Sequence, residues 1–280
     1  MASDTSRDRP IPLPGSVLRR VERWRGPARE LLDDHVAEEV PVAIVCNGES
    51  FAVMMATPAD LADFAIGFAL SEGLVEQASD ARVERIEHLL EGIAIHLAIP
   101  AARAEALSRR QRSLEGRSGC GICGTRMLED VLRHLPPVST DVRVHTDAMR
   151  RAMRGLHAAQ AINALTGATH AAGWAAPDGT LRMAREDVGR HNALDKLVGA
   201  MHHAGIDPGD GFLVVTSRAS YEMVMKAAAA GIALMAAVSA PTALAISLAD
   251  GAKLTLVGFA REDGHTVYTH AQRLLHGDRR

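Results

Sequence analysis

Residues 211–238 read GFLVVTSRASYEMVMKAAAAGIALMAAV, and this stretch decides the fold. The apolar run over 212–216 has the length of a buried strand, and a helix-forming segment follows over 220–231. A second apolar run, over 232–238, predicts another strand. The alternation extends in both directions, with predicted strands at 170–176, 181–185, 253–258 and 266–269 and predicted helices at 191–204 and 242–249. Strands alternating with helices predict an α/β domain whose sheet is largely parallel and covered on both faces.

The N-terminal half has a different pattern, which predicts a smaller and β-rich domain. A predicted strand at 40–46 leads into Asn47-Gly48, a strong hairpin signal, and a return strand at 51–55. Thr57 followed by a proline predicts the N-cap of a helix, and a second hairpin is predicted over 82–99. We therefore expect a disordered lead-in over 1–35, a β-rich domain over 36–135 and a larger domain over 140–275.

The composition limits the classes of function. The chain has 31 basic and 34 acidic residues, whereas a general nucleic-acid binder carries a basic excess. Three cysteines do not make a disulfide framework, so we expect a cytoplasmic protein. Residues 227–249 are uncharged and long enough to cross a bilayer, but Gly231, Ser239 and Pro241 favour a buried helix–strand–helix. We expect neither nucleic acid nor membrane as a partner.

Cys120 and Cys123 lie within a glycine-rich segment, 118–125, that is flanked by Arg117 and Arg126. Glycines let the backbone bend or swing, and nearby cations stabilise a thiolate. We interpret the segment as a mobile arm that carries a reactive sulfur. A zinc site and a dithiol switch are the alternatives for a CxxC pair. A structural zinc site needs four ligands, and the sequence has no other CxxC pair, so we expect no metal. A dithiol switch usually follows a strand, whereas an Arg- and Gly-rich segment precedes this pair.

Polar residues gather where three predicted strands end. Each segment contains one arginine, respectively Arg190, Arg218 and Arg261, and the segments are 186–192 (EDVGRHN), 216–222 (TSRASYE) and 258–261 (GFAR). Any one of them alone is more often a solvated loop than a site. However, ligands of such sheets bind at the carboxyl ends of strands, where arginines and free helix N–H groups suit phosphate. We predict that the three arginines line one pocket for an anion or a nucleotide.

Taken in order, these segments resemble the FdhD family of formate dehydrogenase accessory sulfurtransferases over residues 36–275. The motifs that carry the resemblance are Glu39-Val40-Pro41, Gly119-Cys120-Gly121-Ile122-Cys123-Gly124, Thr166-Gly167 with His170, the segment 186–192, Ser217-Arg218 with Ser220 and Glu222, and Gly258-Phe259-Ala260-Arg261. A lone CGxCG is a weak signal, but the ordered set is specific.

The resemblance implies a sulfurtransferase that carries sulfur as a cysteine persulfide. Such proteins accept sulfur from a cysteine desulfurase and transfer it to the bis(molybdopterin guanine dinucleotide) molybdenum cofactor of formate dehydrogenase. Cys120 matches the persulfide cysteine and Cys123 its companion. The expected cofactor-binding residues are Phe259, Ala260, Arg261, Glu262, Asp263, Gly264, Arg190, Ser217 and Arg218. We expect GDP to bind as a fragment of the cofactor, and the three arginines to line its pocket.

The resemblance also implies a homodimer and a cytidine-deaminase-like, three-layer α/β/α domain. It does not imply deaminase chemistry, which needs H-x-E upstream of P-C-x-x-C. Here the CxxC precedes His170, and Ala172 stands where the glutamate would be. The competing function is a non-catalytic chaperone that delivers the cofactor to the apoenzyme.

The two cysteines of the pair are not equivalent. Cys123 lies closer to the helix predicted after the loop, whose N-terminus would stabilise its thiolate. Acidity alone does not select the carrier, because nucleophilicity falls as the thiol pKa falls. Reach toward two large partners and the resemblance both favour Cys120 as the carrier.

Overall fold

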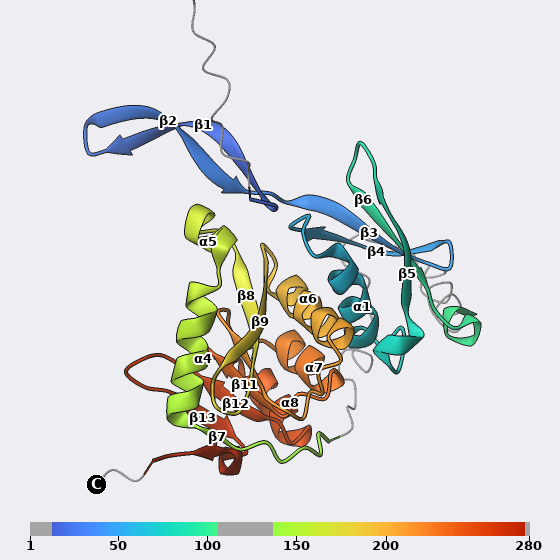
Figure 1. The fold of residues 1–280 in the computed structure, drawn as a ribbon, viewed down its shortest axis with the longest axis vertical. Coiled ribbons are helices and arrows are strands. Elements are labelled where there is room, and N and C mark those ends of the chain that lie inside the picture. The colour runs from blue at the N-terminus through green and yellow to red at the C-terminus, as the bar shows by residue number, and fades with distance from the viewer. Residues whose placement is uncertain (1–12, 106–136, 278–280) are drawn as a thin grey trace, which may run out of the picture.

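The computed structural model describes residues 13–105 and 137–277 of the 280-residue chain. Two hydrophobic cores lie within these ranges, one built from residues 42–104 and the larger one from residues after 137. They meet where helix α1 (Leu61–Ser71) packs against helix α6 (Arg190–His203), as Figure 1 shows.

The larger core is built on a six-stranded sheet with the order β13-β12-β11-β10-β8-β9. Its strands are β8 (His170–Ala175), β9 (Leu181–Asp187), β10 (Phe212–Val215), β11 (Leu234–Ala237), β12 (Thr255–Gly258) and β13 (Thr266–Thr269). Only β10, β11 and β12 are parallel neighbours, and the other three pairs are antiparallel. The α/β class is confirmed, but the prediction of a largely parallel sheet is wrong. The connections β8–β9 and β12–β13 contain no helix, and short connections of that kind join antiparallel strands.

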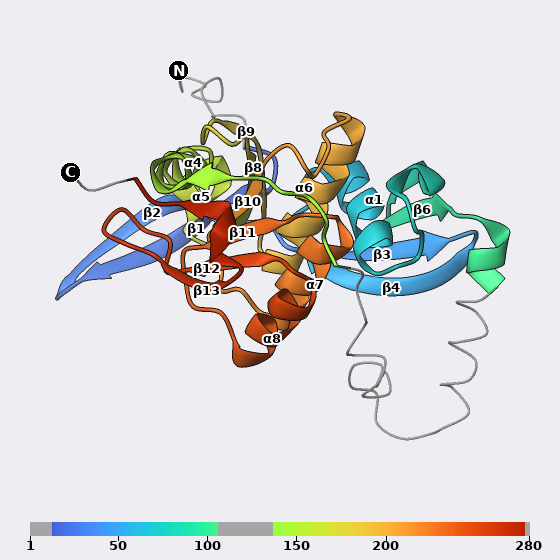
Figure 2. The ribbon, with the colours of Figure 1, turned by 90° about the horizontal axis from the view of Figure 1, so that it is seen from below.

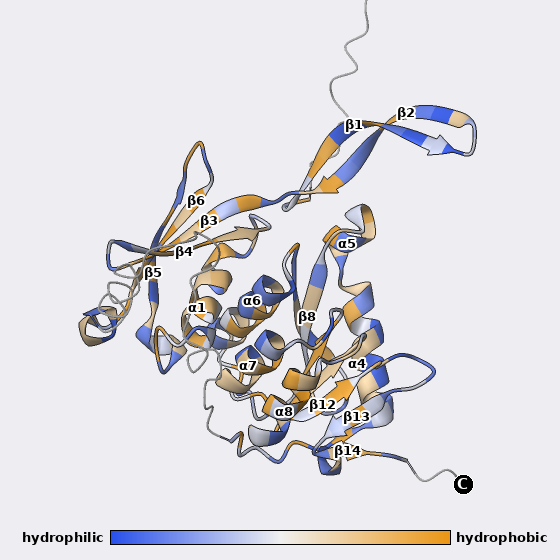
Figure 3. Ribbon diagram, turned by 180° about the vertical axis from the view of Figure 1, so that it is seen from behind, coloured by the Kyte–Doolittle hydropathy of each residue, from blue (hydrophilic) through white to orange (hydrophobic). Residues whose placement is uncertain are grey.

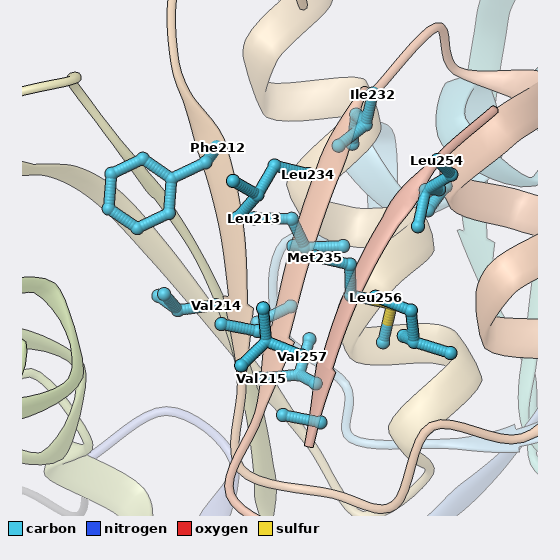
Figure 4. Packing of buried hydrophobic residues seen from close by; sticks show 14 of the residues in the cluster. Phe212, Leu213, Val214, Val215, Ile232, Leu234, Met235, Leu254, Leu256 and Val257 are labelled. Atoms are coloured by element: carbon cyan, nitrogen blue, oxygen red, sulfur yellow. The ribbon is translucent and has the colours of Figure 1, made fainter. Parts of the chain in front are cut away.

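Helices cover both faces of this sheet. Helix α4 (Thr146–Ala158) lies on one face, and α6, α7 (Tyr221–Ala229) and α8 (Ala243–Gly251) lie on the other, as Figures 1 and 2 show. Every residue of β10, β11 and β12 is buried, which explains their continuous apolar runs. Figure 4 shows the side chains of these strands packed against one another.

The sequence from Thr146 to about Leu165 has the pattern of one long helix that Thr146 and Asp147 begin, but the structure divides it in two. Helix α4 ends at Ala158, and α5 (Ala161–Thr166) begins after Gln160. The first free N–H groups of α5 donate to a carboxylate from β9, which replaces the bonds that a continuous helix would make. A partner far along the chain therefore causes the break.

The smaller core lies under a four-stranded sheet with the order β4-β3-β6-β5. Its strands are β3 (Val40–Cys46), β4 (Glu49–Ala56), β5 (Arg82–His88) and β6 (Ile93–Ala98), and a short 3-10 helix spans Ala78–Asp80. Both predicted hairpins are confirmed, and the parallel pair β3–β6 joins them. The predicted helix start is wrong by one turn. Asp60, with φ of 53°, precedes α1, and Thr57 is not the N-cap of this helix.

Two glycines allow α1 and α6 to approach closely. A Cβ added at Gly67 of α1 would overlap the backbone oxygen of Asp195, and one added at Gly199 of α6 would overlap the backbone oxygen of Asp63. Any larger residue at this crossing would push the helices apart. The contact between the two cores therefore depends on the absence of side chains.

A hairpin of β1 (Ser16–Arg25) and β2 (Ala28–Ala37) projects from the body, and it contradicts the disordered lead-in expected over 1–35. Residues 1–12 of that lead-in lie outside the described ranges. Figure 3 shows hydrophilic and hydrophobic residues alternating along the hairpin. Opposite charges pair across the ribbon, with Arg23 3.0 Å from Asp34 and Arg29 2.7 Å from Glu22. Arginines of this segment thus form ion pairs with acidic residues of the opposite strand.

Residues 227–249 form the end of α7, strand β11 and most of α8, as the sequence predicts. Most of the first half of this stretch, residues 227–237, is buried in the larger core, whereas Thr242, Ala243, Leu244 and Ser247 are exposed. No helix in the described ranges has the length and hydrophobicity needed to cross a membrane. A last pair of short parallel strands, β7 (Val144–His145) and β14 (Leu274–Leu275), joins the two ends of the larger unit.

Candidate functional site: the carboxyl edge of the six-stranded sheet

The polar strand ends come together at one edge of the six-stranded sheet. β10, β11 and β12 are parallel, so their carboxyl ends coincide. β8 runs opposite to β10, which brings its first residue, His170, to the same edge, and Asp187 at the end of β9 pairs with His170. The segments that meet there are 186–192, 216–222 and 259–264, and we call them the carboxyl edge.

The two acidic residues of the first segment serve the fold. Glu186 accepts hydrogen bonds from the backbone N–H groups of Ile162 and Asn163, at 2.9 and 2.8 Å, and so caps helix α5. Asp187 forms a 2.7 Å ion pair with Lys196, and both side chains are fully buried. The density of polar residues in this segment therefore has a structural cause as well as a functional one.

Arg190 and His191, the first two residues of α6, are the members of this segment left for a ligand. The buried Nε of Arg190 has no hydrogen-bond partner within the described ranges. The Nε2 atom of His191 lies 2.8 Å from Glu222 Oε2 and 3.4 Å from Ser220 Oγ. His191 thus ties the N-terminus of α6 to that of α7, and Arg190 stands beside them with an unused donor.

These charges influence one another. The hydrogen bond from His191 holds the pKa of the Glu222 carboxyl below its usual range, and the nearby Arg190 charge acts in the same direction. Burial lowers the pKa of His170, and the positive charges of Arg190 and His191 lower it further. The carboxyl edge therefore holds an ionised Glu222 and a His170 that resists protonation.

The second segment follows β10. The hydroxyl of Thr216 accepts a hydrogen bond from the N–H of Ala171 at 2.9 Å, which extends the β8–β10 pairing. Ser217 is buried and its hydroxyl donates to the carbonyl of Arg218. The Arg218 side chain itself is exposed. Ser220 directly precedes α7, and its side chain makes no capping hydrogen bond.

The third segment is a tight turn after β12. Phe259 is 41% exposed and adopts the left-handed φ of 51°, a conformation that is uncommon for an aromatic residue. Ala260 is buried, and Arg261 donates from Nε to the carbonyl of Val238 at 3.3 Å. The N–H of Arg261 donates to the carbonyl of Gly264, which closes the turn.

The two acidic residues of this turn are both exposed. Glu262 forms a 3.1 Å ion pair with Arg154 of α4, and both side chains are more than half exposed. Asp263 is exposed. The turn thus lies between the end of β11 and helix α4.

A cavity of about 290 Å³ opens at the carboxyl edge between α4, α5 and the sheet. Its lining residues are Met153, His157, Gln160, Asn163, Thr169, His170, Thr216 and Val238. Sequence reasoning identified only His170 and Thr216 among them. No motif of the sequence marks His157, Gln160 and Asn163. His157 reaches the cavity from α4, and the break before α5 places Gln160 and Asn163 at the same cavity.

Arg190, Arg218 and Arg261 are not among the residues that line this cavity. Arg261 reaches its rim through the hydrogen bond to Val238, and Arg190 lies close enough to His170 to lower its pKa. Each of the three arginines belongs to one of the three segments of the carboxyl edge, as the sequence predicts.

Cys120 and Cys123, with the whole predicted arm, lie outside the described residues. Cys46, the remaining cysteine, is buried in the smaller core, and burial raises the pKa of its thiol to about 11. It is therefore protonated at neutral pH and is a poor nucleophile. Within the ranges 13–105 and 137–277, no three His, Cys, Asp or Glu side chains gather closely enough to hold a metal ion.

Polar strand ends and two adjacent helix N-termini are typical of α/β proteins that bind ligands at the carboxyl ends of their strands. The chain belongs to the FdhD/NarQ family, whose model matches residues 37–275.

Individual relatives cover nearly the whole chain. A protein of Xanthomonas campestris pv. campestris (strain B100) named "Sulfur carrier protein FdhD" is 58% identical over 261 residues, which is 93% of each chain. A protein of the same name from Cupriavidus necator is 55% identical over 256 residues, covering 91% of this chain and 89% of the relative. A crystal structure from Desulfotalea psychrophila, assigned as a formate dehydrogenase accessory protein, matches with a TM-score of 0.74 at 25% identity. That match covers 94% of this chain and all of the other.

Proposed function

We propose that this protein is a cytoplasmic sulfur carrier that supplies sulfur to the molybdenum cofactor of a formate dehydrogenase. The observation that carries the proposal is similarity to sulfur carriers at 55–58% identity over more than nine tenths of the chain. The sulfur comes from a cysteine desulfurase and is held as a persulfide on Cys120. The protein acts as a homodimer.

The chemistry of the cysteines agrees with this role. Because Cys46 is buried and its thiol pKa is raised to about 11, the reactive thiolate comes from Cys120 or Cys123. The Cys120 thiolate attacks the outer sulfur of the desulfurase persulfide, the donor's S–S bond breaks, and the desulfurase cysteine leaves as a thiolate. Sulfur moves in this step without any external oxidant or reductant.

The cofactor is the substrate, and we propose that its guanine dinucleotide groups bind at the carboxyl edge. The unused Nε donor of Arg190 supports this assignment, since a buried donor without a partner fits an anionic ligand that would complete it. The N-terminus of α6, which begins at Arg190, lies at the same edge and favours an anion there. Arg218, Arg261 and the turn 259–264 extend the same surface toward a second phosphate or a base.

Mass spectrometry after incubation with a cysteine desulfurase and cysteine tests the carrier role. We expect the mass of one added sulfur atom on the peptide that contains Cys120. Cys120→Ala should remove it, whereas the control Cys46→Ala should retain it. Sulfur found on Cys123 and kept in Cys120→Ala would reverse the assignment. A Cys120→Ala protein that still activates formate dehydrogenase fully would identify a cofactor chaperone instead.

A further inference from the structure

Thr57, in the smaller unit, is bonded into the turn that begins helix α6 of the larger unit. The backbone N–H of Thr57 donates to Asp187 Oδ2 at 3.0 Å, and its carbonyl accepts from Lys196 Nζ at 2.9 Å. The Thr57 hydroxyl accepts from the N–H of Val188 at 3.1 Å. Thr57 is fully buried, so all three of its polar groups are used in this one contact.

The carboxylate of Asp187 accepts several hydrogen bonds within the same turn. One oxygen accepts from the N–H of Gly189 at 2.8 Å and from the side-chain amide of Asn192 at 3.0 Å. The other accepts from Thr57 and pairs with Lys196 at 2.7 Å. The Asn192 amide also donates to the carbonyl of Met55 at 2.8 Å, which adds a second bond to the smaller unit.

We infer that Thr57, Asp187, Asn192 and Lys196 form a latch that positions Arg190 and His191 for the anionic ligand. The turn 187–189 directly precedes these two residues, and Gly189 is held so tightly that an added Cβ would lie 2.8 Å from Asn192. The inference rests on the proposed anion binding at the carboxyl edge. Thr57 is then a positioning residue that acts from the smaller unit. Ligand binding at the carboxyl edge of the larger unit therefore depends on the smaller unit.

The charge of the ligand explains why such positioning matters. Arg190 and His191 act through directed N–H groups, whose energy falls steeply with misalignment. A buried network in low dielectric holds its geometry more rigidly than solvated contacts do. Valine at position 57 would fill the same space as threonine. It would, however, leave the N–H of Val188 without a hydrogen-bond acceptor.

The test compares Thr57→Val with the matched control Ser71→Ala in the full chain. Ser71 is also fully buried, and its hydroxyl also bonds an ion pair that includes α6, lying 2.6 Å from Asp195 Oδ1 and 2.8 Å from Lys226 Nζ. We expect both variants to lower the melting temperature. Only Thr57→Val should weaken GDP binding in calorimetry, by roughly tenfold, the loss expected for one misplaced charge-assisted hydrogen bond. Thr57→Ser should restore the affinity, and Arg190→Ala should lose it as a positive control.

A second readout does not depend on GDP. The NMR signals of the His191 ring should shift in Thr57→Val and stay unchanged in Ser71→Ala, because only the first variant releases the α6 turn. If the wild type binds no GDP, the proposed ligand fails, and the His191 signals alone decide the latch. Unmoved His191 signals, or equal GDP affinity in the two variants, would overturn the latch. If Thr57→Val does not fold, Asn192→Ala takes its place in both measurements.

Discussion

His170 shows at the level of one residue how the carboxyl edge controls charge. It begins β8, lines the cavity and is half-buried. Burial lowers its pKa first, and Arg190 and His191 act in the same direction against the weaker opposing effect of Asp187. A neutral imidazole can both donate and accept a hydrogen bond, which suits the edge of a nucleotide base.

The lowered pKa of His170 predicts a pH-dependent stability. In the folded state His170 takes up its proton at a lower pH than the ordinary value of 6.5, so the unfolded chain binds the proton more readily. The contribution is therefore fully favourable above pH 6.5 and decreases as the pH falls below it. The loss of unfolding free energy between pH 7.5 and 5.5 should be smaller in His170→Gln than in the wild type. Urea denaturation at the two pH values measures this.

The size of the His170 effect is limited. One proton over the single pH unit below 6.5 gives at most about 1.4 kcal/mol, and solvent screening of a half-buried group makes it smaller. The difference between wild type and variant isolates His170 because the other titrating groups cancel. Identical losses in the two proteins would show that His170 titrates as it does in the unfolded chain.

Among the elements, the crossing of α1 and α6 joins the two units most directly. Gly67 and Gly199 face the backbone of the opposite helix with no room for a Cβ. We expect Gly67→Ala to lower the free energy of unfolding by about 1–3 kcal/mol, because the helices must separate to admit the methyl group. Chemical denaturation measures the change.

Gly251, the last residue of α8, provides the matched control for that substitution. A Cβ added there meets no atom within 4 Å. Gly251→Ala should be neutral or should stabilise by up to about 1 kcal/mol, since alanine loses less conformational entropy in a helix. An equal change in unfolding free energy at both positions would mean that the close approach of the two helices does not govern Gly67.

Two other elements show where sequence patterns fail. The β1–β2 hairpin was interpreted as disordered from its arginines and prolines, yet its charges lie opposite one another only once the register is fixed. The break between α4 and α5 depends on Glu186, which is distant in sequence from the residues it caps. In both cases the deciding contact is made across the fold, so local periodicity does not contain it.

For the whole molecule, the strand–helix alternation after residue 169 was sufficient to predict the strands of the larger sheet and its polar edge, but not its antiparallel pairs. Strands such as β10 and β11 are fully buried, which agrees with their short and continuous apolar runs. The site itself was predicted only in part. Arg190 and His191 stand at a strand end, as expected, but Thr57 and His157 reach the edge through tertiary packing that no motif records.

Lys226 completes the connection between the two units. Its Nζ lies 2.9 Å from both Asp195 Oδ2 of α6 and Glu72 Oε1 just after α1. Burial alone would lower the pKa of Lys226, but the two carboxylates outweigh burial and raise it, so the ammonium stays charged. The same two cores are thus joined by the ion pairs of Lys226, by the α1–α6 crossing at Gly67 and Gly199, and by the hydrogen bonds of Thr57. They should therefore unfold as one cooperative unit.

Hydrogen exchange at increasing urea concentration tests this cooperativity. In the wild type, peptides covering β6 in the smaller core and β10 in the larger core should lose protection at the same urea concentration. Lys226→Met leaves Asp195 buried without its partner and should cost about 3–5 kcal/mol, with β6 opening before β10. Adding Asp195→Asn should recover part of that loss, because the uncompensated charge is removed. Separate transitions for β6 and β10 in the wild type would show that the two cores are independent, and that the buried contacts between them orient the units without coupling their stability.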